Sequence, residues 1–174
     1  MIDVMILGFL AEEPLHGYEL RRRMEQLHGY SRTISDGTLY PAVKRMEAAG
    51  WLTREAEPGR GAAQRQTLRL TDLGLSELHA RLRGAKGHDI SDGSRFFVVL
   101  AFLSLLPDKA ERDAVLHRRL DFLEQPGVSF FYDGDRPLAA KDLQDPYRRG
   151  VLISARATSR AERKWIREIL GGAS

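Results

Sequence analysis

The segment ISDGTLYPAVKRMEAAGWL, residues 34–52, places cations and hydroxyls around very small side chains. At the rotation of roughly 100° per residue of a helix, Gly37 and Pro41 fall in the middle of one face. Ammonium and guanidinium groups bind phosphates or guanine edges, and hydroxyls donate hydrogen bonds to phosphate. The pattern therefore indicates a surface that meets nucleic acid closely. The groups that could do this on the same face and its edges are Thr38, Tyr40, Lys44 and Arg45.

Glycine and proline oppose a helix in this segment, because they cost about 1 and about 3 kcal/mol in a helix interior. The cost falls if Ser35 or Asp36 caps the helix, since Gly37 then lies in the first turn and Pro41 removes one early backbone bond. A major groove about 12 Å wide admits such a helix. An ordinary amphipathic surface helix with a poor start is the alternative. The predicted core face consists of Leu39, Ala42, Val43 and Met46.

Other chemistry finds little support in the sequence. The chain has no cysteine, which excludes disulfides, thiolate catalysis and cysteine-ligated metals. Its five histidines are scattered, and there is no nucleophile elbow, paired-histidine motif or Walker loop. The segment DGD at 133–135 lacks the further oxygen ligands of a calcium loop. We therefore expect no enzymatic activity, no cofactor and no metal site.

The composition is compatible with nucleic-acid binding without requiring it. Of 174 residues, 43% are hydrophobic and 29% are charged, and the net charge is +3. The N-terminal residues do not resemble a signal peptide. The longest apolar run, residues 96–106, is too short to span a bilayer. We expect a cytoplasmic protein.

The first half of the chain follows the order helix, helix, helix, hairpin, helix. Continuous apolar residues over 2–11 predict a central helix, and i, i+4, i+7 spacing predicts a second helix over 16–28. After the segment quoted above, two runs around the turn PGRGAA predict a β-hairpin, and Thr71 is a typical N-cap of a helix ending at Gly84. This order predicts a winged helix-turn-helix whose third helix enters the major groove. The polar residues of the wing are Arg60, Gln64, Arg65 and Gln66.

The second half is predicted to be helical. Residues 85–94 are rich in Gly, Asp and Ser and indicate a linker. Residues 126–144 have no clear period and fit an ordered loop or a short hairpin. The expected fold is mainly α with a small β-hairpin: a winged helix-turn-helix domain over 1–84 and an all-α dimerisation domain over 95–174. The helices predicted in the latter are 95–106, 108–125 and 145–170.

Three stretches, ILGFLAEEPLHGYELRRRM, ISDGTLYPAVKRMEAAGWL and RLTDLG, together resemble the PadR family of bacterial transcriptional regulators. The resemblance covers about residues 4–80. The helical tail is similar, in length and pattern, to the C-terminal domain of the virulence-activator-like branch. The resemblance implies a dimeric winged-helix protein that binds near-palindromic double-stranded DNA, usually as a repressor that a small molecule relieves.

Carried over residue by residue, the resemblance places the groove helix on Thr38, Leu39, Tyr40, Pro41 and Lys44, with Tyr18 near the DNA backbone. The wing departs from the family, because the place of its basic-aromatic run reads AAQRQTLRLT without a tyrosine. The predicted DNA-binding residues are Tyr18, Ser35, Gly37, Thr38, Leu39, Tyr40, Pro41, Lys44, Arg45, Arg60, Gln64 and Arg65.

A helix over 145–170 would be about 39 Å long at about 1.5 Å per residue and carries an apolar stripe. We infer that it packs against a partner subunit together with the helix at 95–106. The predicted dimer contacts are Phe96, Val99, Leu103, Val151, Ala155, Trp165 and Ile169. Phe97, Phe130 and Trp165 are candidates for a pocket that holds a small aromatic effector, with ordinary core packing as the alternative.

Two other functions stay open at this point. A winged helix can serve protein contacts alone, and an activator without a ligand would bind DNA in the same way as a repressor. Lys44 and Arg45 favour DNA over a protein partner, although Asp36 and Glu47 on the same helix reduce the contrast.

Overall fold

The computed structural model describes residues 1–29, 33–57, 65–125, 131–133 and 136–172. The chain divides into two compact units, Met1–Arg112 and Asp113–Ser174, and each is described by itself. The expected fold class is confirmed, since helices dominate and the sheets are small.

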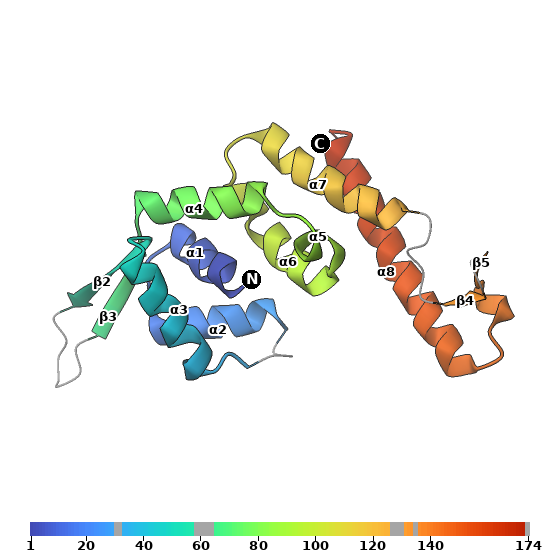
Figure 1. Ribbon diagram of the computed structural model, residues 1–174, viewed down its shortest axis with the longest axis horizontal. Coiled ribbons are helices and arrows are strands. Elements are labelled where there is room, and N and C mark those ends of the chain that lie inside the picture. Colours follow the sequence, from blue (N-terminus) through green and yellow to red (C-terminus); the bar gives the residue numbers. More distant parts are fainter. Residues whose placement is uncertain (30–32, 58–64, 126–130, 134–135, 173–174) are drawn as a thin grey trace. The chain divides into compact units, whose positions relative to one another are not determined.

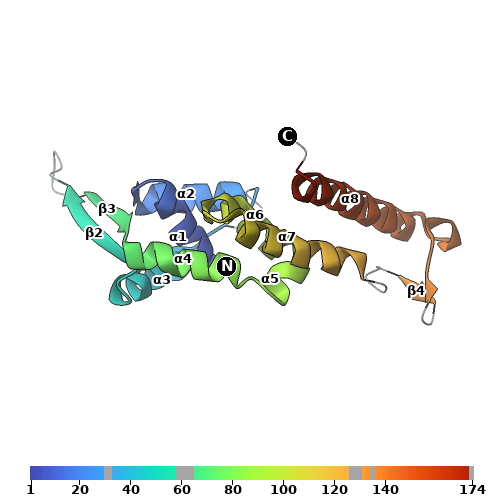
Figure 2. The ribbon, with the colours of Figure 1, turned by 90° about the horizontal axis from the view of Figure 1, so that it is seen from above.

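The first unit contains the predicted helices and hairpin. Because α1 has apolar side chains all round, it occupies the centre, between α4 on one side and α2 and α3 on the other (Figure 1). The hairpin β2–β3 projects beyond these helices in both views (Figures 1 and 2). The bounds are α1 Ile2–Glu12, α2 Gly17–Leu27, α3 Asp36–Ala48, β2 Leu52–Glu57, β3 Arg65–Leu70 and α4 Asp72–Arg83.

A third strand, β1 (Leu15–His16), was not predicted from the sequence, because two residues are too few to show the alternation of a strand. It pairs antiparallel with β3, with Leu15 opposite Leu68 and His16 opposite Thr67, so the sheet order is β1-β3-β2. This pairing ties the start of α2 to the base of the wing.

The segment predicted as a linker is folded into the first unit. It contains the short helix α5 (His88–Ser91), and Ala85 and Ile90 are buried. The helix that follows, α6 (Gly93–Phe102), packs against α1, where the rings of Phe9 and Phe102 meet edge to face at 5.0 Å. The 3-10 turn η1 (Leu103–Leu105) completes this packing. The predicted division at 85–94 therefore does not coincide with the boundary between the compact units.

Three predicted dimer contacts are wrong for this reason. Phe96, Val99 and Leu103 are buried in the core of the first unit, with at most 5% of their surface exposed. The apolar run correctly indicated burial, but it could not show that these side chains are buried within the first unit of the same chain.

Helix α7 (Lys109–Glu124) leads into the second unit, where its later turns pair with α8 (Pro146–Leu170). Asp145 caps α8 by accepting from the backbone N–H of Tyr147 at 2.8 Å, and Pro146 takes the first turn, as predicted. Between these helices, β4 (Tyr132–Asp133) pairs antiparallel with β5 (Arg136–Pro137), followed by the 3-10 turn η2 (Ala140–Asp142). A short hairpin was one of the two structures expected there.

Candidate nucleic-acid interface

The way α3 begins reduces the free-energy cost of having a glycine and a proline in this helix. Ser35 is the N-cap residue, and its carbonyl accepts from the backbone N–H groups of Thr38 and Leu39 at 3.0 Å each. Gly37 therefore lies in the first turn, as predicted. The hydroxyls of Ser35 and Thr38 lie 2.9 Å apart and form a hydrogen bond. The helix thus begins with a polar, exposed turn.

The buried and exposed faces of α3 are the ones predicted from the helical spacing of its residues. The core face, Leu39, Ala42, Val43 and Met46, is buried. One predicted DNA contact is corrected: Leu39 is 1% exposed, because it belongs to the core face and anchors the helix. The residues exposed on the other face and its edges are Gly37, Thr38, Tyr40, Pro41, Lys44 and Arg45.

Three charged groups of α3 are compensated within the chain. Asp36 pairs with Arg21, and Glu47 pairs with Arg54. Arg45 donates to a carboxylate oxygen of Asp3 at 2.7 Å. In the part of the chain that the structure describes, Lys44 has no ion-pair partner. Among the described residues, the exposed face of α3 therefore offers one cation outside any ion pair, whereas its carboxylates Asp36 and Glu47 are already paired.

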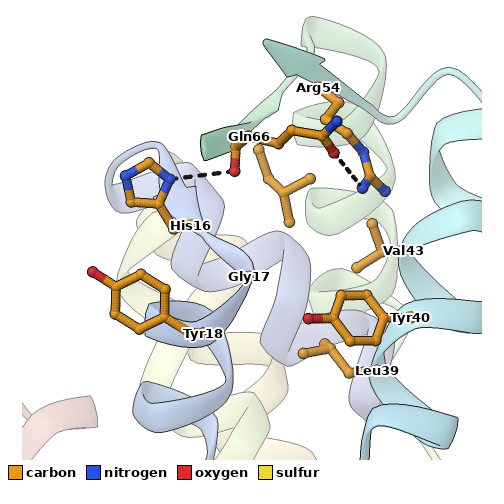
Figure 3. A pocket seen from close by; sticks show the side chains of 9 residues that line it. His16, Gly17, Tyr18, Leu39, Tyr40, Val43, Arg54 and Gln66 are labelled. Atoms are coloured by element: carbon orange, nitrogen blue, oxygen red, sulfur yellow. Dashed lines mark hydrogen bonds between the residues drawn. The ribbon is translucent and has the colours of Figure 1, made fainter. Parts of the chain in front are cut away.

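Beside α3 lies a pocket of about 260 Å³, formed by the start of α2, α3 and the base of the wing (Figure 3). The Tyr40 ring lies against Gly17, where an added Cβ would be 3.7 Å from its Cε1 atom. His16 and Tyr18 stack with ring centroids 5.9 Å apart. We call this the helix–wing pocket; its lining is His16, Gly17, Tyr18, Leu39, Tyr40, Val43, Arg54, Gln66 and Leu68.

Arg54 on β2 is the residue of this region that the sequence analysis missed. Its Nε and Nη2 donate to the two carboxylate oxygens of Glu47 at 2.8 and 2.7 Å, and its Nη1 donates to Gln66 Oε1 at 2.8 Å. The hydrogen bond from Arg54 holds the pKa of the Glu47 carboxyl below its ordinary value of 4.5, with Lys44 adding a smaller effect of the same sign. In the sequence, only the position of Arg54 two residues after Leu52 could have pointed to it, because this spacing places both side chains on the same face of the strand.

This pair predicts a dependence of stability on pH. Because the pKa of Glu47 is depressed in the folded state, its contribution is full above the unfolded pKa and is lost as the pH falls through the folded pKa. We expect Glu47→Gln to be less stable than wild type at pH 7, with the difference shrinking as the pH falls below about 4.5. Urea unfolding at a series of pH values measures this. A difference that stayed constant down to pH 3 would show that the pair contributes nothing through ionisation.

The wing is only partly visible. Arg60 and Gln64 lie outside the described residues, and Arg65 is described only as the first residue of β3. Arg69 is paired across the hairpin with Thr53 and is exposed on the face that does not carry Arg54. Its Nε donates to a carboxylate oxygen of Glu55 at 2.6 Å. The predicted wing contacts therefore stay predictions.

Sequence comparison decides the family. Residues 6–80 match the sequence pattern of the transcriptional regulator PadR-like family. Over 103 residues the chain is 33% identical to the transcriptional regulator Rv3488 of Mycobacterium tuberculosis, which covers 53% of this chain and 92% of that protein. The chain belongs to the PadR-like family of transcriptional regulators. The predicted resemblance is confirmed, whereas the virulence-activator-like character of the tail stays a prediction.

Solved structures similar to this PadR-like chain cover different shares of it. A transcriptional regulator from Clostridium thermocellum, Cth-833, is 26% identical and covers 45% of this chain and 76% of its own, with a TM-score of 0.42. Bacillus subtilis PadR in complex with operator DNA is 20% identical and covers 97% of each chain, with a TM-score of 0.47. Family membership therefore rests on the sequence matches.

The second unit of the PadR-like chain contains the remaining predicted site residues. Val151, Trp165 and Ile169 on α8 are exposed, and Ala155 is half-buried. Of the predicted effector residues, Phe97 is 52% exposed in the first unit, Trp165 is in the second, and Phe130 lies outside the described residues.

The described residues contain neither a metal-binding cluster nor a membrane-spanning helix. No group of three or more His, Cys, Asp or Glu side chains in them is arranged to hold a metal ion. No described helix combines the length and the apolar character needed to cross a membrane. The family to which the chain belongs is one of transcriptional regulators.

Proposed function

We propose that this chain is a sequence-specific DNA-binding regulator that inserts α3 into the major groove, most simply as a dimeric repressor. The observation that carries the proposal is the exposed face of α3, where Lys44 lies among small side chains and has no ion-pair partner in the described part of the chain. Family membership supports the same role. The alternative of a module for protein contacts is disfavoured because Asp36 and Glu47 are both neutralised by arginines.

On this proposal each exposed group of α3 has a separate task. Gly37 and Pro41 have small side chains, so the middle of the exposed face does not protrude and the helix backbone can approach the base edges. Lys44 reaches a guanine edge or a phosphate, and Thr38 and Tyr40 donate hydrogen bonds to phosphates on either side. Arg45 contributes less than Lys44, because binding DNA requires it to leave Asp3.

A homodimer is part of the proposal because α8 exposes an apolar stripe. At about 100° per residue, Tyr147, Val151, Trp165 and Ile169 fall within about 40° of one another. All four are exposed, beside the buried face that contains Leu152 and Ile166. A second copy placed on this stripe would give two-fold symmetry, which sets two α3 helices about 34–36 Å apart on a near-palindromic operator.

We further propose that a small aromatic effector relieves DNA binding. The predicted contacts are Phe97, Phe130 and Trp165, and the exposed ring of Trp165 on α8 supports this proposal. In the cytoplasm such a ligand would act by favouring a dimer geometry in which the two α3 helices no longer match the groove spacing.

Fluorescence anisotropy with duplexes tiled across the gene's own promoter, at several salt concentrations, tests the proposed function. We expect tight, salt-dependent binding to one near-palindromic tile and weak binding to scrambled DNA, because phosphate contacts release counterions. Equal and weak binding to all tiles, repeated with duplexes selected from a random library, would contradict sequence-specific binding.

A further inference from the structure

The helix–wing pocket lies next to the α3 face that would enter the groove, and of its lining the proposed function gives a task to Tyr40 alone. Its floor is apolar, formed by Leu39, Val43 and Leu68. Its rim carries two phenols, one imidazole, one guanidinium and one amide, from His16, Tyr18, Tyr40, Arg54 and Gln66. In Figure 3 the Tyr40 hydroxyl points across the pocket toward Gly17, and Arg54 and Gln66 lie above it.

The rim is rich in hydrogen-bond donors. A guanidinium has five N–H donors, and Arg54 uses three of them on Glu47 and Gln66. In the described part of the chain its other two N–H groups have no acceptor. The Gln66 side-chain oxygen accepts from Arg54, which leaves the amide NH₂ group as its donor end. A rim of donors around an apolar floor fits a ligand that brings acceptor oxygens and a carbon skeleton.

We propose that the helix–wing pocket holds one phosphodiester of the DNA backbone with its deoxyribose, and that Arg54 is the phosphate ligand. The inference rests on the proposed function, because it concerns the same DNA. The apolar floor takes the sugar, and Arg54, Gln66 and Tyr40 donate to the phosphate oxygens. Glu47 is a positioning residue, since its bidentate pairing fixes the plane of the guanidinium before DNA arrives.

The hairpin provides a matched control for Arg54. In an antiparallel pair, residues directly opposite one another share a face of the sheet. Arg54 is opposite Leu68, so it faces the pocket, whereas Arg69 is opposite Thr53 on the other face. Both arginines are exposed and both are paired with a glutamate. Their removal changes the net charge equally, yet the proposal gives a DNA contact to Arg54 alone.

The test compares wild type with Arg54→Ala, Arg54→Gln, Arg69→Ala and Glu47→Gln on one 30-base-pair duplex of arbitrary sequence over a range of KCl concentrations. Both Arg54 variants should bind about 10-fold more weakly at low salt, as expected for losing a charge-assisted contact. The slope of log affinity against log salt should fall by about 0.9 for each bound subunit. Arg69→Ala should keep the wild-type affinity and slope. Glu47→Gln should weaken binding but keep the wild-type slope, because the Arg54 cation remains while its guanidinium is no longer held in place. Circular dichroism should show that all variants are folded.

Two results would overturn the inference. Equal loss of slope in the Arg54 and Arg69 variants would mean that only net charge matters. Equal loss of slope in Glu47→Gln and Arg54→Ala would mean that Arg54 acts by supporting the wing rather than by touching phosphate. If wild type bound no duplex at any salt concentration, the proposed function itself would fail, which is distinguishable from either result.

Discussion

Replacing Arg119 by leucine is expected to lower the free energy of unfolding of the second unit by about 3–5 kcal/mol. Arg119 on α7 donates from Nε and Nη2 to the two carboxylate oxygens of Glu162 on α8, at 2.7 and 3.0 Å. The side chains are only 5% and 11% exposed. Leucine would leave the Glu162 carboxylate buried without another partner among the described residues, and an unpaired buried charge is costly.

A double variant separates the pairing from the packing. Because removing both charges leaves neither member of this pair without its partner, Arg119→Leu/Glu162→Leu should recover most of the stability that Arg119→Leu loses. Urea unfolding followed by Trp165 fluorescence, in a Trp51→Phe background, reports on this unit. Equal destabilisation of the single and double variants would contradict the account. In that case the loss would come from the shape of the Arg119 side chain and its contact with the Phe122 ring.

Gly74→Ala is expected to destabilise the first unit by about 3 kcal/mol, the upper end of the usual range for overpacking. A Cβ at Gly74 would lie 2.0 Å from the carbonyl oxygen of Trp51 and 2.8 Å from its carbonyl carbon. These are backbone atoms, and the same carbonyl accepts from the Thr71 N–H at 3.0 Å, so it cannot move away cheaply. The join between α4 and the base of the wing would have to open.

The matched control is Gly150→Ala on α8. Apart from its chain neighbours and the backbone of α8 itself, no heavy atom of the described chain lies within 4 Å of a Cβ built there, so alanine should stabilise the helix by about 0.5–1 kcal/mol. Unfolding of Gly74→Ala is followed by Trp51 fluorescence in a Trp165→Phe background. A loss below about 0.5 kcal/mol, the scale of ordinary surface substitutions, would show that the wing and α4 are not packed as described.

The elements and the core face of α3 could be predicted because both follow from local periodicity. Apolar residues at every third or fourth position indicate which face of a helix is buried. The same periodicity cannot show which element packs on that face. For this reason Phe96 and its neighbours were assigned to a dimer interface, although they are buried within the first unit. The strand β1 was missed for a related reason, since its pairing with β3 joins residues about 50 positions apart.

The candidate site was predictable in its helix but not in its surroundings. Lys44 and its neighbours share one helix, so their arrangement follows from their spacing. Arg54 belongs to the site only through the register of the hairpin and the approach of Glu47, and neither is visible in the order of residues. The ion pairs that neutralise Asp36 and Arg45 also join distant segments, with Arg21 and Asp3.

The central claim is that the exposed face of α3 contacts DNA through Lys44. The most direct test is the anisotropy of the promoter tile that wild type binds best, measured with Lys44→Ala beside Lys164→Ala, an exposed lysine on α8. Lys44→Ala should weaken binding by about 1–3 kcal/mol if it reads a base edge, or lower the salt slope by about one if it binds phosphate. Lys164→Ala should change neither quantity. Wild-type affinity and salt slope for Lys44→Ala would contradict the assignment of α3 as the DNA-reading helix.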